Sequence, residues 1–405
     1  MNKYNVLGAY LSWVMDSYDL GAVIITSTII GNLFFPNLGF LGSVLPIMFT
    51  VISRPLGGFL LGYLTDLKGR KMTLLLTVIG YSASIGVTGL LPTYAQIGII
   101  APISIIALRI LQGLFIGGDV ASSFALAMES IERRRGFYSG LMQSGVLVGF
   151  VIVDYFFSYL TLQDWFIQFG WRLIFLLGMI PALLAVLIRI KVSDPEVFQK
   201  LGRSRRPLAG LKPFYQTILV TIGFWIISYS GPTFIPTVLG QFLHLKPQEY
   251  GFLVLYMNVI GIPSMIISGL LSDFIGRKAI GILGLVLASL GGILFYTKLI
   301  FSQPLLTPVL LFGFLVNLPQ AITPAYLAER FKTASRGLGI GFSYNGGFII
   351  AGFTQLIISI LSNFIPLLMA SAIILTLGSL ISATGLLLGP ETLKVNSLDE
   401  ELKRI

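Results

Sequence analysis

Two copies of one short pattern divide this chain into similar halves. Residues 62–71 read GYLTDLKGRK and residues 269–278 read GLLSDFIGRK, so the second copy begins 207 residues after the first. Each copy follows a long apolar stretch and opens another. A polar turn that recurs in this way in an apolar chain predicts two related groups of helices rather than one soluble core.

The low charge content places most of the protein surface in lipid. Of 405 residues, 55% are hydrophobic and 11% are charged, whereas a soluble domain carries roughly 25% charged residues. The net charge of +10 collects in short segments between apolar runs, so we expect a bilayer as the surrounding medium and no nucleic-acid partner. With no cysteine and a single histidine, His244, the chain offers no thiolate or histidine-rich metal site.

Apolar segments of membrane-spanning length recur along the whole chain. A helix needs about 20 apolar residues to cross ~30 Å of hydrocarbon. Twelve segments qualify, near 6–31, 40–64, 72–92, 98–122, 137–160, 171–190, 214–239, 250–271, 279–299, 305–328, 338–362 and 365–388. They lack the alternation of a membrane barrel. The sequence therefore predicts an all-α membrane protein with twelve transmembrane helices in two pseudo-symmetric six-helix bundles.

Further landmarks recur in the same order in both halves. The matches are Glu129 with Glu329, Arg135-Gly136 with Arg336-Gly337, and Pro195-Glu196 with Pro390-Glu391. A polar and basic stretch lies between the halves. We therefore expect an N-terminal bundle at 1–190, a cytoplasmic linker at 191–212, a C-terminal bundle at 213–390 and a cytoplasmic tail at 391–405.

Lysine and arginine placement sets the expected orientation. With the N-terminus inside, the inner segments hold Lys3, Lys68, Arg70, Lys71, Arg133, Arg134, Arg135, Arg277, Lys278, Arg330, Lys332 and Arg336, besides those of the linker and tail. The outer side holds Lys246 and Lys298, with Arg172 at an edge. Because positive residues stay inside, both termini are expected in the cytoplasm of a multi-pass plasma-membrane protein.

The repeated turns resemble the signature of the major facilitator superfamily. Arg109-x-x-Gln112-Gly113 followed by Gly117-Gly118-Asp119 is similar to the fourth-helix motif of that family, which more often ends in Glu. The resemblance covers nearly the whole chain. It implies a transporter rather than an enzyme, acting on a small-molecule substrate by alternating access. We expect a monomer, since one chain completes the pathway.

A narrower resemblance points to a substrate class. Trp13-x-x-Asp16-x-x-Asp19 resembles the helix-1 signature of the metabolite–proton symporters, which carry lactate, sialate, aromatic acids and similar anions. Residues 221–231 read TIGFWIISYSG and lack the paired glutamines of sugar porters. The resemblance implies proton-coupled symport of a small organic acid, with the proton as coupling ion and no other cofactor.

Three ionisable residues are expected near the middle of the membrane. Counting 1.5 Å per residue, Asp16 lies ~15 Å deep and Asp19 ~20 Å deep on helix 1, while Arg109 lies ~17 Å below the outer surface. Repulsion between two close carboxylates favours a proton on one of them. These residues are the predicted proton-coupling site. The alternative is a static ion pair between helices 1 and 4.

A second set of charges is predicted to gate the cytoplasmic side. Asp66 is expected to cap a helix N-terminus or to pair with a cation of the other half. Asp119 is expected at the inner end of helix 4, where it joins Asp66 and Arg70. The full predicted set is Asp66, Arg70, Asp119, Glu129, Asp273, Arg277, Glu329 and Arg336. The alternative is an anchor that only fixes topology.

Neutral polar residues at membrane depth are the predicted substrate contacts. They are Gln112, Gln143, Trp225, Tyr229, Asn258, Asn317, Gln320 and Asn345. Hydrogen bonds between helices are the alternative role. Arg54 is expected toward the cytoplasmic end of its helix, where it pairs with a nearby acid or helix terminus. Asp154 is expected near the outer end of helix 5, at a solvated helix end, with a role in an outer gate as the alternative.

Other functions of the same sequence remain open at this stage. A sugar or polyol porter, or a drug or metabolite exporter, would keep the fold and change the chemistry. A transporter-like receptor would bind ligand without moving it. A membrane enzyme is disfavoured, because no nucleophile and base occur together in the predicted bundle.

Overall fold

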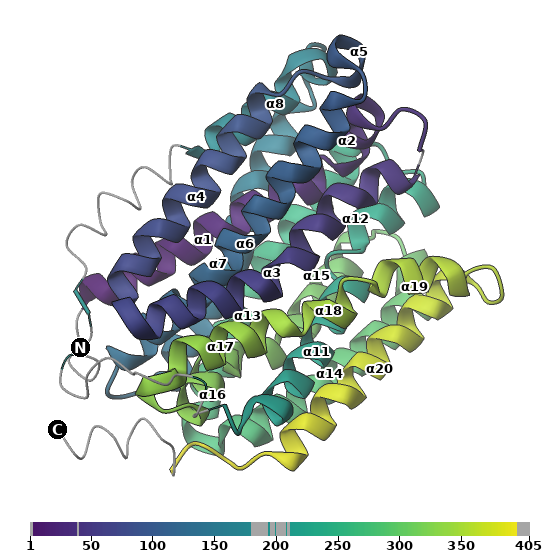
Figure 1. The fold of residues 1–405 in the computed structure, drawn as a ribbon. Coiled ribbons are helices and arrows are strands. Elements are labelled where there is room, and N and C mark those ends of the chain that lie inside the picture. Colours follow the sequence, from purple (N-terminus) through teal and green to yellow (C-terminus); the bar gives the residue numbers. More distant parts are fainter. Residues whose placement is uncertain are drawn as a thin grey trace.

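The computed structural model describes residues 3–38, 40–179, 193, 194, 199, 208 and 211–394, and regular structure in this part of the chain is helical (Figure 1). The N-terminal half contains α1 (Lys3–Ile25), α2 (Ser27–Phe34), α3 (Phe40–Lys68), α4 (Arg70–Leu90), α5 (Tyr94–Ile97), α6 (Ile100–Glu129), α7 (Arg135–Leu160), the π-helix η1 (Phe166–Gly170) and α8 (Trp171–Leu177).

The C-terminal half begins at α11. Its elements are α11 (Phe214–Ser230), α12 (Ile235–Thr237), η3 (Val238–Phe242), α13 (Pro247–Ile275), α14 (Arg277–Thr297), η4 (Leu299–Phe301), α15 (Leu306–Asn317), η5 (Pro319–Ile322), α16 (Thr323–Arg330), η6 (Thr333–Ser335), α17 (Arg336–Gly346), α18 (Phe348–Ala351), α19 (Thr354–Leu361) and α20 (Leu367–Leu388).

Ten helical segments of the described residues are long and apolar enough to cross a membrane. Helix α1 is outside this set, since it carries two buried aspartates and a buried polar face. The predicted span at 171–190 begins as α8 and continues beyond residue 179, outside the described residues. Most of the predicted linker and the tail from residue 395 also lie outside them. The count of twelve helices therefore stays a prediction.

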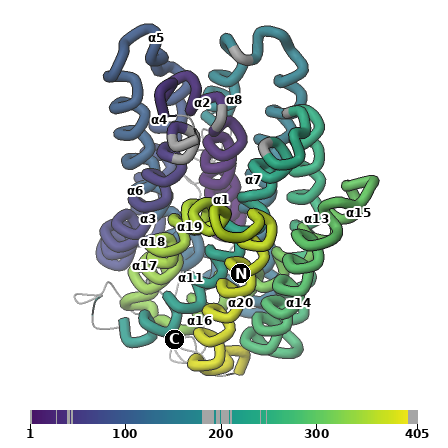
Figure 2. The backbone as a smooth tube through the Cα atoms, turned by 90° about the vertical axis from the view of Figure 1, so that its right-hand side faces the viewer, coloured from purple at the N-terminus to yellow at the C-terminus, as the bar shows by residue number. Residues whose placement is uncertain are grey.

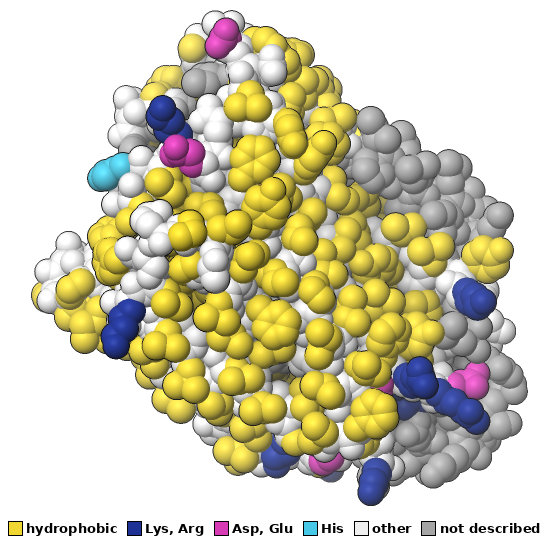
Figure 3. All heavy atoms as spheres, turned by 180° about the vertical axis from the view of Figure 1, so that it is seen from behind, with side chains coloured by type: hydrophobic (Ala, Val, Ile, Leu, Met, Phe, Trp, Pro, Cys, Tyr) yellow, Lys and Arg dark blue, Asp and Glu magenta, His cyan; other side chains and the backbone are white. Residues whose placement is uncertain are grey.

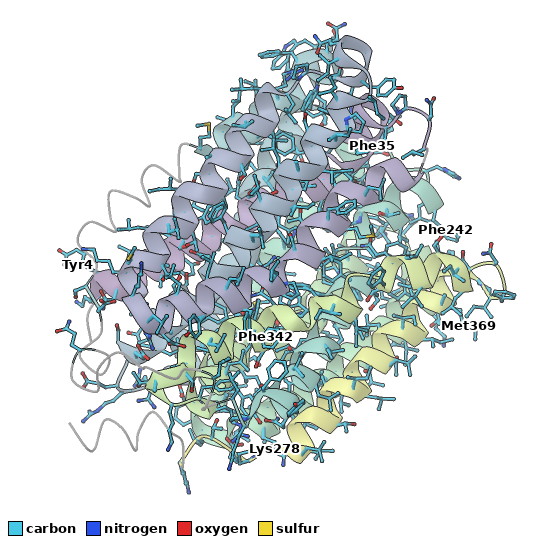
Figure 4. The ribbon with its side chains drawn as sticks, in the orientation of Figure 1. Tyr4, Phe35, Phe242, Lys278, Phe342 and Met369 are labelled. Atoms are coloured by element: carbon cyan, nitrogen blue, oxygen red, sulfur yellow. The ribbon has the colours of Figure 1, made fainter. Side chains whose placement is uncertain are left out.

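The long helices run between two ends of the molecule. Tyr4 and Lys278 lie at one end, called the near end here, and Phe35, Phe242 and Met369 lie at the far end (Figure 4). Hydrophobic side chains cover the broad middle of the face in Figure 3, while charged side chains gather toward its two ends. This distribution suits a bundle that exposes its middle to hydrocarbon and its ends to water.

The most extensive contacts between the halves are those of α7 with α13 and of α3 with α17 (Figure 2). Both pairs approach closely at glycines. A Cβ added to Gly269 would lie 2.4 Å from the carbonyl oxygen of Gly136, and one added to Gly58 would lie 2.4 Å from that of Gly341. No larger residue fits these crossings without moving a backbone, so glycine sets the distance between the halves.

Two helices of the C-terminal half are interrupted within their spans. Helix α11 ends at Ser230, ahead of the Gly231-Pro232 step, and α15 ends at Asn317, ahead of Pro319. Proline cannot donate the helical hydrogen bond at its own position, so these steps break the regular ladder. Interrupted helices are typical of the substrate region of transporters.

Candidate functional site

Helix α1 carries two buried aspartates into the middle of the bundle. Asp16 and Asp19 are each 1% exposed. The Oδ2 atom of Asp16 lies 3.7 Å from Nη2 of Arg54, and Oδ1 of Asp19 lies 4.0 Å from Nη1 of Arg109. The i, i+3 spacing on one helix therefore places the two carboxylates against two different arginines.

The four carboxylate oxygens of Asp16 and Asp19 have no hydrogen-bond partner among the described residues. Buried polar atoms are usually hydrogen-bonded, and each exception calls for an explanation. A structural ion pair would bring the guanidinium to hydrogen-bonding distance, near 2.8 Å. The observed spacing instead leaves acceptor positions for a proton or for a polar group of a bound molecule.

Arg54 belongs to this site, although the sequence placed it nearer the end of its helix. It lies midway along α3, because that helix extends to Lys68. Besides facing Asp16, its Nε donates to Oδ1 of Asn345 at 3.2 Å, and its guanidinium lies 4.7 Å from the ring centroid of Phe348. Asn345 and Phe348 belong to the other half, so Arg54 bridges the two.

Arg109 is enclosed within the N-terminal half. It donates to the hydroxyl of Thr88 and lies 5.9 Å from the ring centroid of Phe175. Its Nε and Nη1 atoms have no hydrogen-bond partner among the described residues. Gln112, one turn further along α6, lies close enough to interact with the Asp19 carboxylate, although its amide atoms make no hydrogen bond of good geometry with the described residues. Of the three residues predicted to couple protons, Asp19 and Arg109 therefore form one pair, while Asp16 faces Arg54 instead.

An aromatic cluster joins the halves next to Arg54. Trp225 stacks on Phe348 with centroids 4.3 Å apart, and it meets Tyr344 edge-on at 4.8 Å. Tyr344 also contacts Trp13 of α1 at 5.7 Å. Trp13 is 1% exposed and its indole N–H has no partner among the described residues. Flat rings beside an acid and an arginine suit a small molecule with both apolar and charged parts.

The predicted substrate contacts divide into two groups. Gln112, Gln143, Trp225, Tyr229 and Asn345 lie around the Asp16–Arg54 and Asp19–Arg109 pairs. The remaining three lie elsewhere: Asn258 bonds Asp154, Asn317 bonds the carbonyl of Gly313, and Gln320 bonds Ser228 within the C-terminal half. Asn317 bonds a carbonyl one turn earlier in its own helix α15, and Gln320 bonds Ser228 of α11, so hydrogen bonds within and between helices account for these two contacts.

At the near end, the first repeated turn forms a fully buried junction, called the Asp66 junction here. Asp66 accepts the backbone N–H groups of Gly337 and Leu338 at 3.0 and 2.8 Å, at the N-terminus of α17 in the other half. Arg70 bonds Asp66 at 2.9 Å and both oxygens of Glu129 at 3.0 and 3.1 Å. The helix N-terminus and the guanidinium together neutralise the buried carboxylate.

A cross-half ion pair completes the Asp66 junction. Nη1 of Arg336 donates to Glu129 at 2.7 Å, and Nη2 of Arg70 donates to the carbonyl of Thr333 at 3.0 Å. Arg336 and Thr333 belong to the C-terminal half. These contacts hold the two halves together at the near end.

The second repeated turn forms a matching arrangement, called the Asp273 junction here. Asp273 accepts the backbone N–H groups of Gly136 and Phe137 at 2.7 and 2.9 Å, at the start of α7 in the N-terminal half. Arg277 bonds Asp273 at 2.8 Å and Glu329 at 3.2 Å. Seven of the eight predicted gating residues therefore meet in two matched junctions.

Asp119 is the exception among the predicted gating residues. The sequence placed it at the inner end of its helix, but α6 continues to Glu129, ten residues further on. At 1.5 Å per residue, Asp119 lies ~15 Å from the level of Glu129. Its carboxylate accepts hydrogen bonds from Ser12, Thr77 and Ser123, which joins α1, α4 and α6 within one half.

Two capping carboxylates complete the near end. Asp194 accepts the backbone N–H of Lys71, at the start of α4, at 3.0 Å. Glu391 accepts those of Arg277 and Lys278, at the start of α14, at 2.9 Å each. In the sequence, Pro390-Glu391 matches Pro195-Glu196, so the counterpart of Glu391 was expected at Glu196; the only signal of Asp194 is its place just before Pro195.

Asp154 also departs from its expected position. It was expected at a solvated helix end, but it is 3% exposed and accepts a hydrogen bond from Asn258 of the other half at 2.9 Å. Helix α7 continues to Leu160, and α13 covers this part of it. The position of α13 is the reason for the burial.

Comparison with known proteins identifies the family. A sequence profile of the Major Facilitator Superfamily matches residues 4–353. A putative proline/betaine transporter of Staphylococcus aureus (strain COL) is 29% identical over 374 residues, which cover 85% of this chain and 80% of that protein. The inner membrane metabolite transport protein YhjE of Escherichia coli (strain K12) is 30% identical over 352 residues, or 81% and 79%.

Solved structures agree on the fold. The proton:xylose symporter XylE, bound to 6-bromo-6-deoxy-D-glucose, superposes with a TM-score of 0.82 over 98% of both chains. The two sequences are 16% identical, so this likeness concerns the fold alone. Together with the ten apolar spans and the two near-end junctions, these findings show that the chain belongs to the major facilitator superfamily and is a multi-pass membrane transporter rather than an enzyme.

Proposed function

We propose that this transporter couples the inward movement of a proton to the uptake of a small carboxylate-bearing metabolite by alternating access. The observation that carries the proposal is the pair of buried aspartates on α1, whose oxygens face arginines at 3.7 and 4.0 Å without a hydrogen bond. An ionisable group inside a membrane bundle is costly, and its usual reason is function.

The two aspartates have different surroundings, which supports different roles. Asp19 faces Arg109 inside the N-terminal half, away from the seam between halves. Asp16 faces Arg54, which reaches Asn345 and Phe348 across the seam. We assign the coupling proton to the two aspartates together. A substrate carboxylate would compete with Asp16 for Arg54, and a proton on Asp16 would release the arginine for it.

A narrower substrate class has support from the site and from the relatives. Proteins named as proline/betaine transporters are similar to this chain over most of its length. Such compounds carry a carboxylate and a cationic nitrogen. Arg54 would hold the carboxylate, while the rings of Trp225, Tyr344 and Phe348 would face the nitrogen and its apolar surroundings.

The orientation in the membrane is part of the proposal. The near end carries most of the lysines and arginines outside the spans, which supports a cytoplasmic near end and cytoplasmic termini in the plasma membrane. The Asp66 and Asp273 junctions would then close the cytoplasmic side in this conformation. Inward opening would require both to separate, since each links one half to the other.

Uptake into proteoliposomes under an inward proton gradient tests the proposal. Lactate-like acids, proline and betaine, and xylose would be offered separately, with and without a protonophore. We expect uptake of a carboxylate compound that collapses with the protonophore. Xylose uptake, or uptake indifferent to the gradient, would contradict the assignment.

Substitutions at the central site locate the coupling. We expect Asp16→Asn or Asp19→Asn to abolish gradient-driven accumulation while counterflow of labelled substrate persists in at least one of them. Asp164→Asn is the matched control, since Asp164 is an exposed carboxylate of the same half. Gradient-driven uptake that survives in both aspartate variants would refute the coupling role.

A further inference from the structure

A second buried carboxylate lies between the halves, outside the central site. A far-end cavity has an empty volume of about 330 Å³, its open mouth included. Its lining comes from both halves, with Ile24, Phe150 and Asp154 on the N-terminal side and Pro232, Val254 and Asn258 on the C-terminal side. Asp154 is the one ionisable group in this otherwise largely apolar lining.

Asp154 and Asn258 form a contact that is incomplete in its present form. Nδ2 of Asn258 donates to Oδ2 of Asp154 at 2.9 Å, and both residues are 3% exposed. The Oδ1 atom of Asn258 is buried without a hydrogen-bond partner among the described residues. An ionised carboxylate cannot satisfy that oxygen, since it has no donor, whereas a carboxylic acid supplies one O–H.

No cation compensates the charge of Asp154 in the part of the chain that the structure describes. Every nearby charged group on the helices packed against α7 has another described partner. On α1, Asp16 faces Arg54 and Asp19 faces Arg109; on α13, Glu249 accepts the backbone N–H of Lys246; on α8, Arg172 donates to the carbonyls of Gly89 and Leu91.

The other titratable groups nearby are tyrosines. Tyr155 and Tyr159 of α7 are exposed, Tyr18 of α1 donates to the carbonyl of Ile174, and Tyr250 of α13 packs on Phe157. Among the remaining elements packed on α7, the charges of α6 and α16 are Arg109, Asp119, Glu129, Glu329 and Arg330, which bond elsewhere. None of these groups neutralises Asp154.

We propose that Asp154 is a second proton-binding site, reached from the far end, whose protonation favours closure of that end. Closure of the cavity removes water from the carboxylate, which costs much free energy for the charged form and little for the neutral acid. The protonated carboxyl would donate a hydrogen bond to Oδ1 of Asn258, so that the N–H and the C=O of the amide would both be hydrogen-bonded to Asp154. By linkage, a state that binds the proton more tightly is favoured as the pH falls.

This inference rests on the proposed alternating access but not on the proposed substrate or coupling site. A single proton changes the ratio of closed to open far ends by at most about tenfold per pH unit. The expected signature is therefore a far-end distance between the halves that shortens on acidification, with a steepness no greater than one proton allows.

The absence of cysteine makes this distance directly measurable. Leu162 and Phe301 are exposed far-end positions in different halves, so both can be replaced by cysteine (Leu162→Cys and Phe301→Cys) and spin-labelled. The distance between the two labels would be measured in lipid nanodiscs between about pH 5 and pH 8, a range close to physiological pH. We expect the short-distance population to rise as the pH falls. Asp154→Asn and Asp154→Ser, neither of which titrates, should each remove the pH dependence.

Two further variants separate this proposal from the coupling assignment. Asp164→Asn removes an exposed carboxylate near the same end and should keep the pH response. The double variant Asp16→Asn/Asp19→Asn should lose coupled uptake and still keep the far-end pH response. A pH response that persists in both Asp154 variants, or a wild-type distance that does not change with pH, would overturn the proposal. Loss of uptake coupling alone would leave it standing.

Discussion

The two near-end junctions come from copies of one sequence pattern, but they differ in how deeply they are buried. In the Asp66 junction the side chains of Asp66, Arg70 and Glu129 are fully buried. In the Asp273 junction the Asp273 side chain is 11% exposed, and Arg277 lies 3.2 Å from Glu329, against 3.0 Å for the matching pair. The other matching distances are similar or slightly shorter in the Asp273 junction, so the same motif differs mainly in its access to water.

This difference teaches that a repeated motif fixes the pattern of contacts but not their strength. Charge interactions weaken with water access, because solvent screens them and can replace a lost partner. We therefore infer that the Asp273 junction opens at lower cost than the Asp66 junction. Inward opening would begin on the α7–α13 side and end on the α3–α17 side.

The largest expected difference between the junctions concerns their glutamates. Glu129→Gln leaves the buried guanidiniums of Arg70 and Arg336 without their shared carboxylate, and removing one partner of a buried pair costs about 3–5 kcal/mol. Glu329→Gln should cost less, since the Asp273 that remains beside Arg277 is 11% exposed, whereas the Asp66 that remains beside Arg70 is fully buried. Unfolding in detergent would measure both free energies, and equal losses would remove the inferred asymmetry.

A smaller difference is expected for the aspartates. Asp66→Asn loses one charge-assisted bond to α17 and its charge pairing with Arg70, about 1.5–3 kcal/mol. Asp273→Asn should lose less free energy, because the side chain at this position is in contact with water. Near-end distances between labelled cysteines in the two halves would report the change. We expect a larger open population for Asp66→Asn than for Asp273→Asn, and the reverse order would contradict the proposed opening sequence.

The smallest effects are expected at the capping carboxylates. Asp194→Asn and Glu391→Gln each weaken an interaction with a helix N-terminus, worth about 0.3–1 kcal/mol. Both variants should transport at nearly the wild-type rate, with slightly lower melting temperatures. A severe loss of uptake in either would show that the caps take part in opening, beyond their contribution to stability.

A second contrast lies between the near-end carboxylates, which hold the two halves together, and the central carboxylates, which can exchange a proton or a substrate group. The near-end carboxylates accept several hydrogen bonds each, whereas the oxygens of Asp16 and Asp19 accept none among the described residues. Carboxylates whose oxygens are all hydrogen-bonded suit a contact that stays closed until the whole junction separates. Carboxylates whose oxygens lack hydrogen-bond partners suit a site where a proton or a substrate group binds and leaves.

Much of this arrangement could be predicted from residue types and spacing. The apolar runs located the ten long spans, and the i, i+3 aspartates on α1 pointed to the buried charges of the centre. The length of α6 was underestimated, which placed Asp119 at the wrong depth. Arg54 was expected to pair with an acid and does face Asp16, but its contact with the other half and the burial of Asp154 were missed, because Asn345 and Asn258 lie far away in the sequence.

The sequence by itself determined which segments are helical and apolar, that Asp16, Asp19 and Arg109 lie at membrane depth, and that the near-end turn occurs twice. These properties depend on hydrophobic periodicity and on neighbours a few residues apart, which the chain order contains. Only the tertiary structure decided which buried charges meet across the halves, which of them stay unsaturated, and that Asp154 faces Asn258 instead of water. Those contacts depend on the approach of distant helices, which glycines such as Gly58 and Gly269 allow and local sequence does not specify.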